Sequence, residues 1–201
     1  MTHLFKQICT AERNVDPEVL NSVLELAVEL AREGREGRKI GTLFTVGDAD
    51  HVLRMSRPLI LDPLYGHPDE LKHISSPDFR ETLKELAQLD GAFVVNDQGV
   101  VVSAARYLEA PGEGVDLPLG LGTRHFAAAA MSKHTNAVAV VVSTSSVVRV
   151  FDDGEIVGEI LPELWLISRA SIHIREPQIE ERPEEKITVV VKESREEDRQ
   201  S

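Results

Sequence analysis

Residues 120–143 read GLGTRHFAAAAMSKHTNAVAVVVS, and this stretch decides the fold. Its first glycines end a long glycine-rich loop that begins at residue 110, and the alanine-rich segment 123–134 strongly favours a helix. The segment 137–142 is wholly apolar and predicts a strand that is buried on both faces of a sheet. A loop, a helix and a buried strand in this order indicate a protein built on one central sheet.

Further helices and strands are predicted on both sides of this stretch. Asp16-Pro17 and Ser76-Pro77 each place a capping side chain before proline, so helices are predicted from 17 to Gly34 and from 77 onward. Predicted strands cover 41–46, 92–95, 100–108, 147–151, 155–160 and 187–191, and a last helix covers 162–170. Because hairpin turns occur together with strand–helix alternation, a mixed sheet is expected. The predicted fold class is α/β, a single domain with a central mixed β-sheet flanked by helices, and α+β is the alternative.

The composition argues against several classes of function. The 201 residues include 34 acidic and 22 basic side chains, and this net charge of −12 argues against a nucleic-acid-binding surface. The longest apolar run has about a third of the roughly 20 residues that a membrane helix needs, and residues 1–10 lack the apolar core of an export signal. Cys9 is the only cysteine, so no disulfide can form within the chain. A cytoplasmic location without membrane contact is expected.

The junction between the glycine loop and the helix is the first candidate site. Gly122 lets the backbone approach a ligand closely, and the first N–H groups of a helix point toward an anion. Thr123 adds a hydroxyl and Arg124 adds a guanidinium suited to phosphate oxygens, so the junction predicts a phosphate site. The spacing of a Walker A loop is absent. The alternative is an ordinary loop before a helix, with Thr123 serving as the cap.

Asp90-Gly91-Ala92 is the second candidate, between a predicted helix and a predicted strand. Two residues with almost no side chain leave room for a ligand to reach the carboxylate, which could bind a divalent metal or orient a hydroxyl. In the alternative, Asp90 belongs to a plain turn in which Gly91 takes a positive φ.

Three further positions carry polar or aromatic groups near these segments. Ser143 follows the buried strand, where it either faces a ligand crevice or belongs to a polar turn. Tyr107 either stacks on a base or is a half-buried strand residue. No pair of histidines has a metal-ligand helical spacing, and His125 is expected to orient its neighbours through hydrogen bonds rather than act as a free base.

Together these segments resemble the catalytic domain of diadenylate cyclases, which condense two ATP molecules into cyclic di-AMP. The matching segments are Asp90-Gly91-Ala92, Arg106-Tyr107-Leu108, Leu121 to Ala128 and Val142-Ser143, within about 120 residues in the family's order. The members without membrane segments, including archaeal ones, are the more similar. The resemblance implies a diadenylate cyclase catalytic domain (39–170). The helical pattern before it and the charged residues after it predict an N-terminal helical segment (1–38) and a peripheral strand with an acidic tail (171–201).

The resemblance also implies a role for each matching position. Asp90 would hold Mn²⁺ or Mg²⁺ and help to activate the ribose 3′-hydroxyl, and Arg124 would neutralise charge on the phosphates. Adenine would be held by Tyr107 and by the backbone of Leu108. The implied catalytic residues are Asp90, Arg124 and His125, and the implied ATP-binding residues are Gly91, Ala92, Tyr107, Leu108, Gly122, Thr123, Arg124, His125 and Ser143.

Two departures from the family pattern leave other functions open. Phe126 stands where members often have a second arginine, and Ser145 stands where some have a metal-binding glutamate. The alternative is a sensor that binds ATP or cyclic di-AMP without turnover, and a scaffold that has kept only the fold is a third possibility. Because each subunit of the family binds one ATP, a homo-oligomer with facing active sites is expected.

Overall fold

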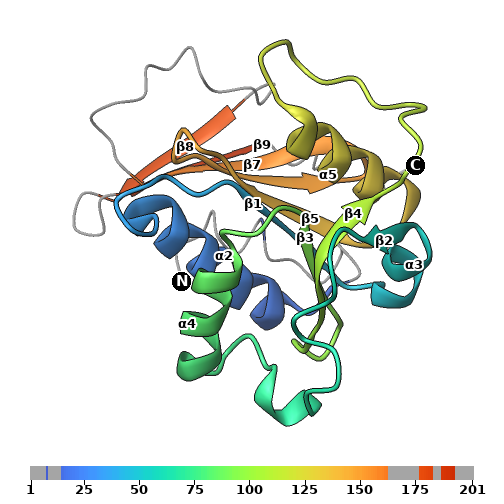
Figure 1. Cartoon of the computed structure of the whole chain (residues 1–201). Helices are drawn as coiled ribbons and strands as arrows, with labels where there is room; N and C mark the ends of the chain where they lie inside the picture. The colour runs from blue at the N-terminus through green and yellow to red at the C-terminus, as the bar shows by residue number, and fades with distance from the viewer. Residues whose placement is uncertain (1–7, 9–14, 163–176, 183–186, 193–201) are drawn as a thin grey trace.

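The computed structural model describes residues 8, 15–162, 177–182 and 187–192, and within them one nine-stranded sheet forms the centre of the fold (Figure 1). The strands are β1 (Thr42–Val46), β2 (Ser56–Pro58), β3 (Ala92–Val95), β4 (Val101–Leu108), β5 (Val138–Val142), β6 (Val148–Asp152), β7 (Glu155–Leu161), β8 (Pro177–Arg182) and β9 (Ile187–Lys192). They lie in the order β2-β4-β3-β1-β5-β6-β7-β9-β8. β1 and β3 are parallel and all other neighbours are antiparallel, which confirms the predicted mixed sheet.

β5 lies within the apolar segment 137–142 and is the middle strand of this sheet. Every residue of β5 is fully buried, and the strand pairs with β1 on one side and β6 on the other. The prediction of a central strand buried on both faces is therefore confirmed.

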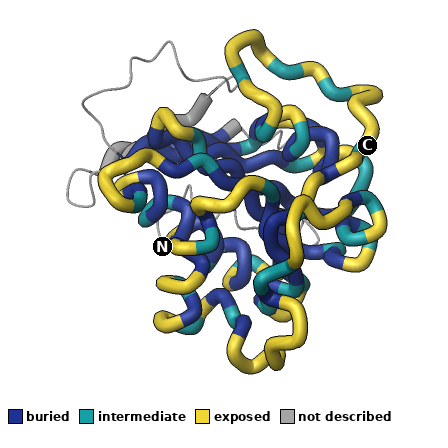
Figure 2. Tube along the Cα trace, in the orientation of Figure 1, coloured by how far each residue is buried: buried dark blue, intermediate teal, exposed yellow. Residues whose placement is uncertain are grey.

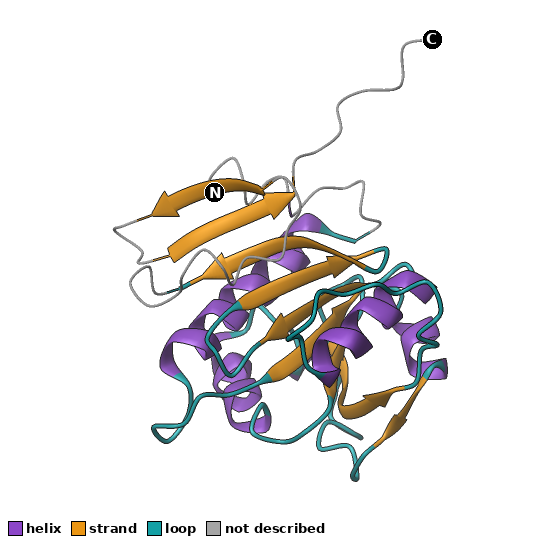
Figure 3. Ribbon diagram, turned by 90° about the horizontal axis from the view of Figure 1, so that it is seen from above, coloured by secondary structure: helices purple, strands orange, loops and turns teal. Residues whose placement is uncertain are grey.

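Helices cover both faces of the sheet (Figure 3). α2 (Pro17–Glu33) and α4 (Pro77–Leu86) pack on one face, and α5 (Thr123–His134) packs on the other with the short α3 (Ala49–Arg54). Because alternate strand residues point to opposite faces, Val140 belongs to the apolar cluster below α2 and Val141 to the cluster below α5. Figure 2 shows that the strands between the two layers are buried. The prediction of an α/β fold is confirmed.

Local sequence signals set the ends of the helices as predicted. The carboxylate of Asp16 accepts the N–H of Glu18 at 2.7 Å at the start of α2, and Gly34 ends this helix with a φ of +61°. The second predicted helix is α4, which begins at Pro77 after the N-cap residue Ser76. The Ser76 side chain makes no capping hydrogen bond, so the prediction that it caps this helix is wrong. Its Lys84 Nζ lies 3.0 Å from the Glu29 carboxylate of α2, so the two helices are also joined by charge.

Some segments differ from the sequence prediction, and one predicted helix lies largely outside the described residues. α3, β2 and the short 3-10 helix η2 (Asp69–Leu71) carry no clear sequence signal and were not expected. The pattern predicts one peripheral strand over 187–191, whereas the structure has the pair β8 and β9 at the edge of the sheet (Figure 3). β8 has the sequence PQIEER, which is too polar to show the alternation of a half-buried strand. Residues 163–170 of the predicted last helix lie outside the described residues.

No helix in the described part of the chain is long and apolar enough to cross a membrane.

Candidate active site

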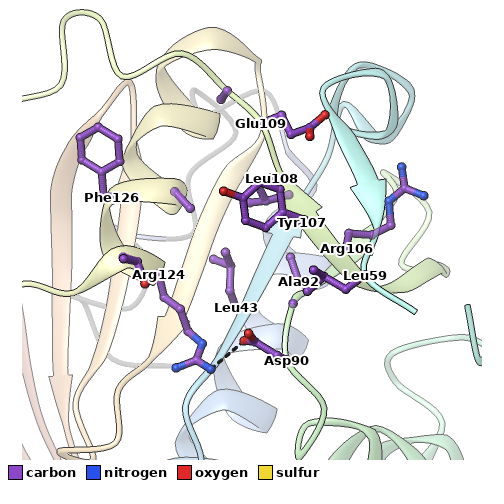
Figure 4. Close-up of a pocket in the computed structure, with 14 residues that line it drawn as sticks. Leu43, Leu59, Asp90, Ala92, Arg106, Tyr107, Leu108, Glu109, Arg124 and Phe126 are labelled. Carbon is purple, nitrogen blue, oxygen red and sulfur yellow. Dashed lines mark hydrogen bonds and ion pairs between the residues drawn. The ribbon is translucent and has the colours of Figure 1, made fainter. Parts of the chain in front are cut away.

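A pocket of about 550 Å³ opens between the N-terminus of α5 and the adjoining ends of β3 and β4 (Figure 4). Seven residues predicted to form the site line it, namely Asp90, Gly91, Ala92, Tyr107, Leu108, Thr123 and Arg124. The fold thus gathers three separate segments of the chain around one cavity. Gly122, His125 and Ser143, also predicted, are not among the lining residues of this pocket.

Asp90 and Arg124 face each other at the pocket (Figure 4). Arg124 Nη2 donates a hydrogen bond to Asp90 Oδ1 at 2.8 Å, and the two side chains remain 41% and 76% exposed. An exposed ion pair contributes only about 0–1 kcal/mol, because water screens both charges. Either side chain can therefore exchange this contact for a ligand with little loss of stability.

The first turn of α5 has no side-chain cap. Gly122 is the N-cap, and its carbonyl accepts the N–H of His125 at 3.0 Å. Thr123 is the first helical residue, so the alternative in which its hydroxyl caps the helix is wrong. A helix N-terminus directs its N–H groups and the positive end of its dipole outward, so this turn suits an anion such as phosphate.

The backbone conformation and the close packing at position 91, at the base of the pocket, require a glycine. Its φ is +105°, and a Cβ at this position would lie 2.7 Å from the carbonyl carbon of Ala105. Ala105 itself has a φ of +53°, at an irregular register between β3 and β4. The positive φ of Gly91 confirms the turn conformation, and the turn still leaves Asp90 on the pocket wall, so the two interpretations of this segment are compatible.

Replacing Gly91 by alanine is expected to destabilise the fold more than the same change at Gly66. Both glycines have a positive φ, but a Cβ at Gly66 meets nothing within 4 Å. Gly66→Ala should cost about 1–2 kcal/mol of unfolding free energy through left-handed strain alone. Gly91→Ala adds a clash with backbone atoms and should cost about 3 kcal/mol or more. Urea unfolding of both variants measures the difference, and equal losses would contradict the close approach to Ala105.

Tyr107 forms a wall of the pocket at the end of β4. The residue is 48% exposed, and the guanidinium carbon of Arg57 lies 4.7 Å from the ring centroid. Arg57 Nε also donates a hydrogen bond to Glu109 at 2.8 Å. Leu108 follows as a buried residue whose backbone pairs with β2. An exposed ring beside an ordered strand backbone suits a flat aromatic ligand such as a nucleobase.

His125 lies in the first turn of α5, on the side of the helix that faces the sheet. It is buried, and its Nε2 is 3.2 Å from Nη1 of Arg149 in β6. This placement agrees with an orienting role through hydrogen bonds, and it does not bring the imidazole to the pocket lining.

Ser143 lies in a turn after β5, where its Oγ is 2.8 Å from the Oγ of Ser145. Gly41, which has no side chain, lies between this turn and the Arg124 guanidinium. A Cβ on Gly41 would lie 3.0 Å from Arg124 Nη1 and 3.1 Å from Thr144 Cγ2. The serine turn therefore borders the Arg124 side of the pocket.

Several lining residues were missed by the sequence prediction, namely Leu43, Leu59, Glu109, Ala110 and Ala127. Leu43 and Phe44 are neighbours on β1, so their side chains point to opposite faces of the sheet. The sequence does not show which of the two faces carries the pocket. Leu59 comes from an irregular segment after β2 and has no periodic signal at all.

The pocket supplies few metal ligands of its own. Within the described residues, no group of three or more His, Cys, Asp or Glu side chains could hold a metal ion. Asp90 is the carboxylate beside Arg124, and Mg²⁺ is commonly held by one or two carboxylates together with substrate phosphates. The donor set therefore fits a divalent ion shared with a nucleotide, and it does not fit an ion held by protein ligands alone.

The DAC family, described as "DisA bacterial checkpoint controller nucleotide-binding", matches residues 29–156, which include the whole pocket. The chain belongs to the DAC family. This match confirms the resemblance that the Asp90 and Arg124 segments suggest.

Two curated relatives are named diadenylate cyclase. The protein from Methanocaldococcus jannaschii is 51% identical over 144 residues, which are 71% of this chain and 45% of that protein. The protein from Haloferax volcanii is 46% identical over 158 residues, which are 77% of this chain and 57% of that protein. This DAC-family chain thus spans about half the length of the curated relatives it matches.

Two solved structures are similar at lower identity. A double cysteine mutant of DacA from Staphylococcus aureus has a TM-score of 0.45 and 21% identity, with 69% of this chain and 84% of that chain covered. A hypothetical membrane spanning protein from Bacillus cereus has a TM-score of 0.47 and 20% identity, with coverages of 69% and 59%.

Proposed function

We propose that this chain is a diadenylate cyclase that condenses two ATP molecules into cyclic di-AMP and releases two pyrophosphates. The observation that carries the proposal is the pairing of Asp90 with Arg124 at an uncapped helix N-terminus, inside the DAC-family region. The names of the two curated relatives support ATP as the substrate and cyclic di-AMP as the product.

The proposed reaction consists of two identical displacements. Each ribose 3′-hydroxyl releases its proton to solvent as its oxygen bonds to the α-phosphorus of the other ATP. The bond from that phosphorus to the oxygen that bridges the α- and β-phosphates breaks, and pyrophosphate departs. Arg124 and the N–H groups of the first turn of α5 would stabilise the charge that develops on the leaving group. Asp90, at 2.8 Å from Arg124, would orient the attacking hydroxyl.

The rest of the pocket would hold the nucleotide in place. The exposed ring of Tyr107 would stack on adenine, and the backbone of Leu108 would read its edge. The hydroxyl of Thr123 would bind a phosphate oxygen at the helix N-terminus, and Ser143 would contact the triphosphate from the neighbouring turn. His125, which does not line the pocket, would orient the first turn of α5 through its contact with Arg149.

Asp90 would hold a divalent ion, Mg²⁺ or Mn²⁺, together with phosphate oxygens of the nucleotide. When bound, such an ion supplies Lewis-acid stabilisation of the reacting phosphate. Because Ser145 stands where some family members have a glutamate, Asp90 would be the main protein carboxylate for this ion.

Product analysis tests the proposed function directly. The purified chain is incubated with ATP and Mn²⁺ or Mg²⁺, and the products are separated by chromatography. Cyclic di-AMP and pyrophosphate should appear in a ratio of one to two, as the two displacements require. ATP binding without cyclic di-AMP under either metal would contradict the cyclase proposal.

The two-site mechanism also predicts how the rate depends on enzyme concentration. Each pocket would bind one ATP, so two subunits must face each other before either bond can form. The rate should therefore rise with the square of the chain concentration wherever sedimentation shows monomers to predominate. A rate that stays first-order in that range would rule out facing subunits as the catalytic form.

A sensor that binds nucleotide without turnover is the second candidate, and two observations favour it. Phe126 lines the pocket and is 46% exposed, where an arginine would add positive charge. The hydroxyl of Ser145 is hydrogen-bonded to Ser143, and this position lacks a carboxylate. The product analysis separates the sensor from the cyclase, because a sensor binds ATP or cyclic di-AMP and leaves the amount of each unchanged.

A further inference from the structure

A buried cluster of three polar side chains lies behind the first turn of α5, on the side of the helix that faces the sheet. Arg149 in β6 and Glu159 in β7 are register partners, and Arg149 Nε donates to Glu159 Oε1 at 2.5 Å. Their side chains are only 5% and 1% exposed. The Nη1 of the same guanidinium lies 3.2 Å from Nε2 of His125, so the cluster connects two strands to the helix.

Stability alone does not explain why this cluster is charged. The desolvation of a buried ion pair offsets most or all of its attraction, and well-packed apolar residues of the same volume are often as stable or more so. The surroundings here are apolar, with Phe151 and Ile156 in the same layer and the Phe151 ring centroid 6.1 Å from that of His125. A buried charge pair in this place is better suited to fixing an orientation than to adding stability.

The chemistry of the contact fixes the state of His125. A guanidinium has only N–H donors, so Arg149 must donate and His125 Nε2 must accept. An imidazole that accepts at Nε2 carries its proton on Nδ1, and this is the tautomer that we propose for His125. Because Nε2 is occupied by Arg149, this nitrogen cannot deliver a proton to a nucleotide in the pocket.

The contact between His125 and Arg149 joins the first turn of α5 to the sheet. His125 directly follows Arg124 in the first turn of α5, and this turn has no side-chain cap to fix it. We infer that Arg149 and Glu159 are positioning residues, which act through His125 to hold the first turn of α5 so that Arg124 and Thr123 face the pocket. This inference rests on the proposed function and extends it to two residues that touch no substrate.

A paired substitution tests the inference without leaving a buried charge alone. In Arg149→Met/Glu159→Leu both charges are removed, so the thermal midpoint should stay at or above that of the unsubstituted chain. The kcat for cyclic di-AMP should nevertheless fall about 10- to 100-fold, because a small displacement of a site residue is enough to slow a reaction strongly. The affinity for a non-hydrolysable ATP analogue should fall with it. A folded double variant with unchanged kcat and unchanged affinity would overturn the inference.

Three further variants distinguish a positioning role from a general loss of structure. Lys133 and Asp153 form an exposed ion pair of 2.9 Å at the other end of α5, so Lys133→Met/Asp153→Leu removes a comparable pair from the same helix. This control should keep kcat within about twofold, because exposed pairs contribute little. Glu159→Gln keeps an oxygen that accepts from Arg149, and it should retain more activity than Glu159→Leu. The reverse order would contradict a role through this hydrogen bond.

The state of His125 can be tested without turnover. Nitrogen-15 spectra of the imidazole should show an unprotonated Nε2 and a protonated Nδ1, and this pattern should be lost in the paired variant. A proton on Nε2 would overturn the inference even if cyclic di-AMP is formed. Conversely, an unsubstituted chain that makes no cyclic di-AMP would refute the cyclase proposal, while the spectra and the analogue affinity would still test the positioning of α5.

Discussion

Asp90→Asn should lower the rate of cyclic di-AMP formation about 10³-fold or more, because the amide has no negative charge with which to hold a divalent ion or orient the 3′-hydroxyl. The fold should be unaffected, since the Asp90 side chain is 76% exposed and lies in a bend before β3. Initial rates with saturating ATP and Mn²⁺ measure the first effect, and urea unfolding measures the second.

The same variant should not lose affinity for ATP when no divalent ion is present. Asp90 contributes negative charge beside the triphosphate and also pairs with Arg124 at 2.8 Å. Its neutralisation removes a like-charge repulsion and frees the guanidinium, so metal-free affinity should stay the same or rise. A parallel loss of metal-free binding and turnover would show that Asp90 supports the pocket and does not serve the reaction.

Asp153→Asn is the matched control for this experiment. Asp153 is 81% exposed in the turn between β6 and β7 and pairs with Lys133 at 2.9 Å, so the substitution makes the same change of charge in a similar ion pair away from the pocket. Both variants should unfold within about 0.5 kcal/mol of the unsubstituted chain. If Asp90→Asn keeps more than a tenth of the activity, or if the control loses as much, the role proposed for Asp90 is wrong.

The parts of the fold that were predicted correctly are those whose signals are local. β5 follows from an unbroken apolar run, and α5 follows from its alanines, because a few consecutive residues determine each. Gly122 before α5 and Asp90-Gly91 before β3 also lie in turns that a few neighbouring residues determine. These local signals predict the helix and the strand beside Asp90 and Arg124, while the assignment of the two side chains to one site came from the resemblance to diadenylate cyclases.

The remaining parts depend on contacts between distant segments. A residue of α5 can be assigned a helical phase from the sequence, but the side that faces β6 is known only when the sheet is assembled, so the burial of His125 against Arg149 could not be predicted. The closeness of the serine turn to Arg124 depends on the pairing of β1 with β5, which brings Gly41 between them. Leu59 lines the pocket from an irregular segment that has no periodicity to interpret.

Arg124→Met should lower kcat/KM about 10³- to 10⁴-fold, because the guanidinium would serve both the bound triphosphate and the departing pyrophosphate. Unlike Asp90→Asn, this variant should also bind a non-hydrolysable ATP analogue more weakly in the absence of metal, since it removes positive charge from an acidic chain with a net charge of −12. Arg54→Met is a suitable control, because Arg54 is an exposed arginine at the end of α3 and does not line the pocket.

Arg124→Lys distinguishes charge from geometry at the same position. Lysine keeps the positive charge but lacks the planar fork that can bind two phosphate oxygens and Asp90 at once. The affinity of the Lys variant for the analogue should therefore lie close to that of the unsubstituted chain, while its kcat should stay at least about tenfold lower. If the Lys variant recovers full kcat, Arg124 acts as a point charge and the Asp90 contact seen in the free protein has no part in aligning it. If it recovers neither quantity, the site requires the Asp90–Arg124 geometry already for binding, and the metal-free affinity of Asp90→Asn for ATP should then fall, contrary to the prediction above.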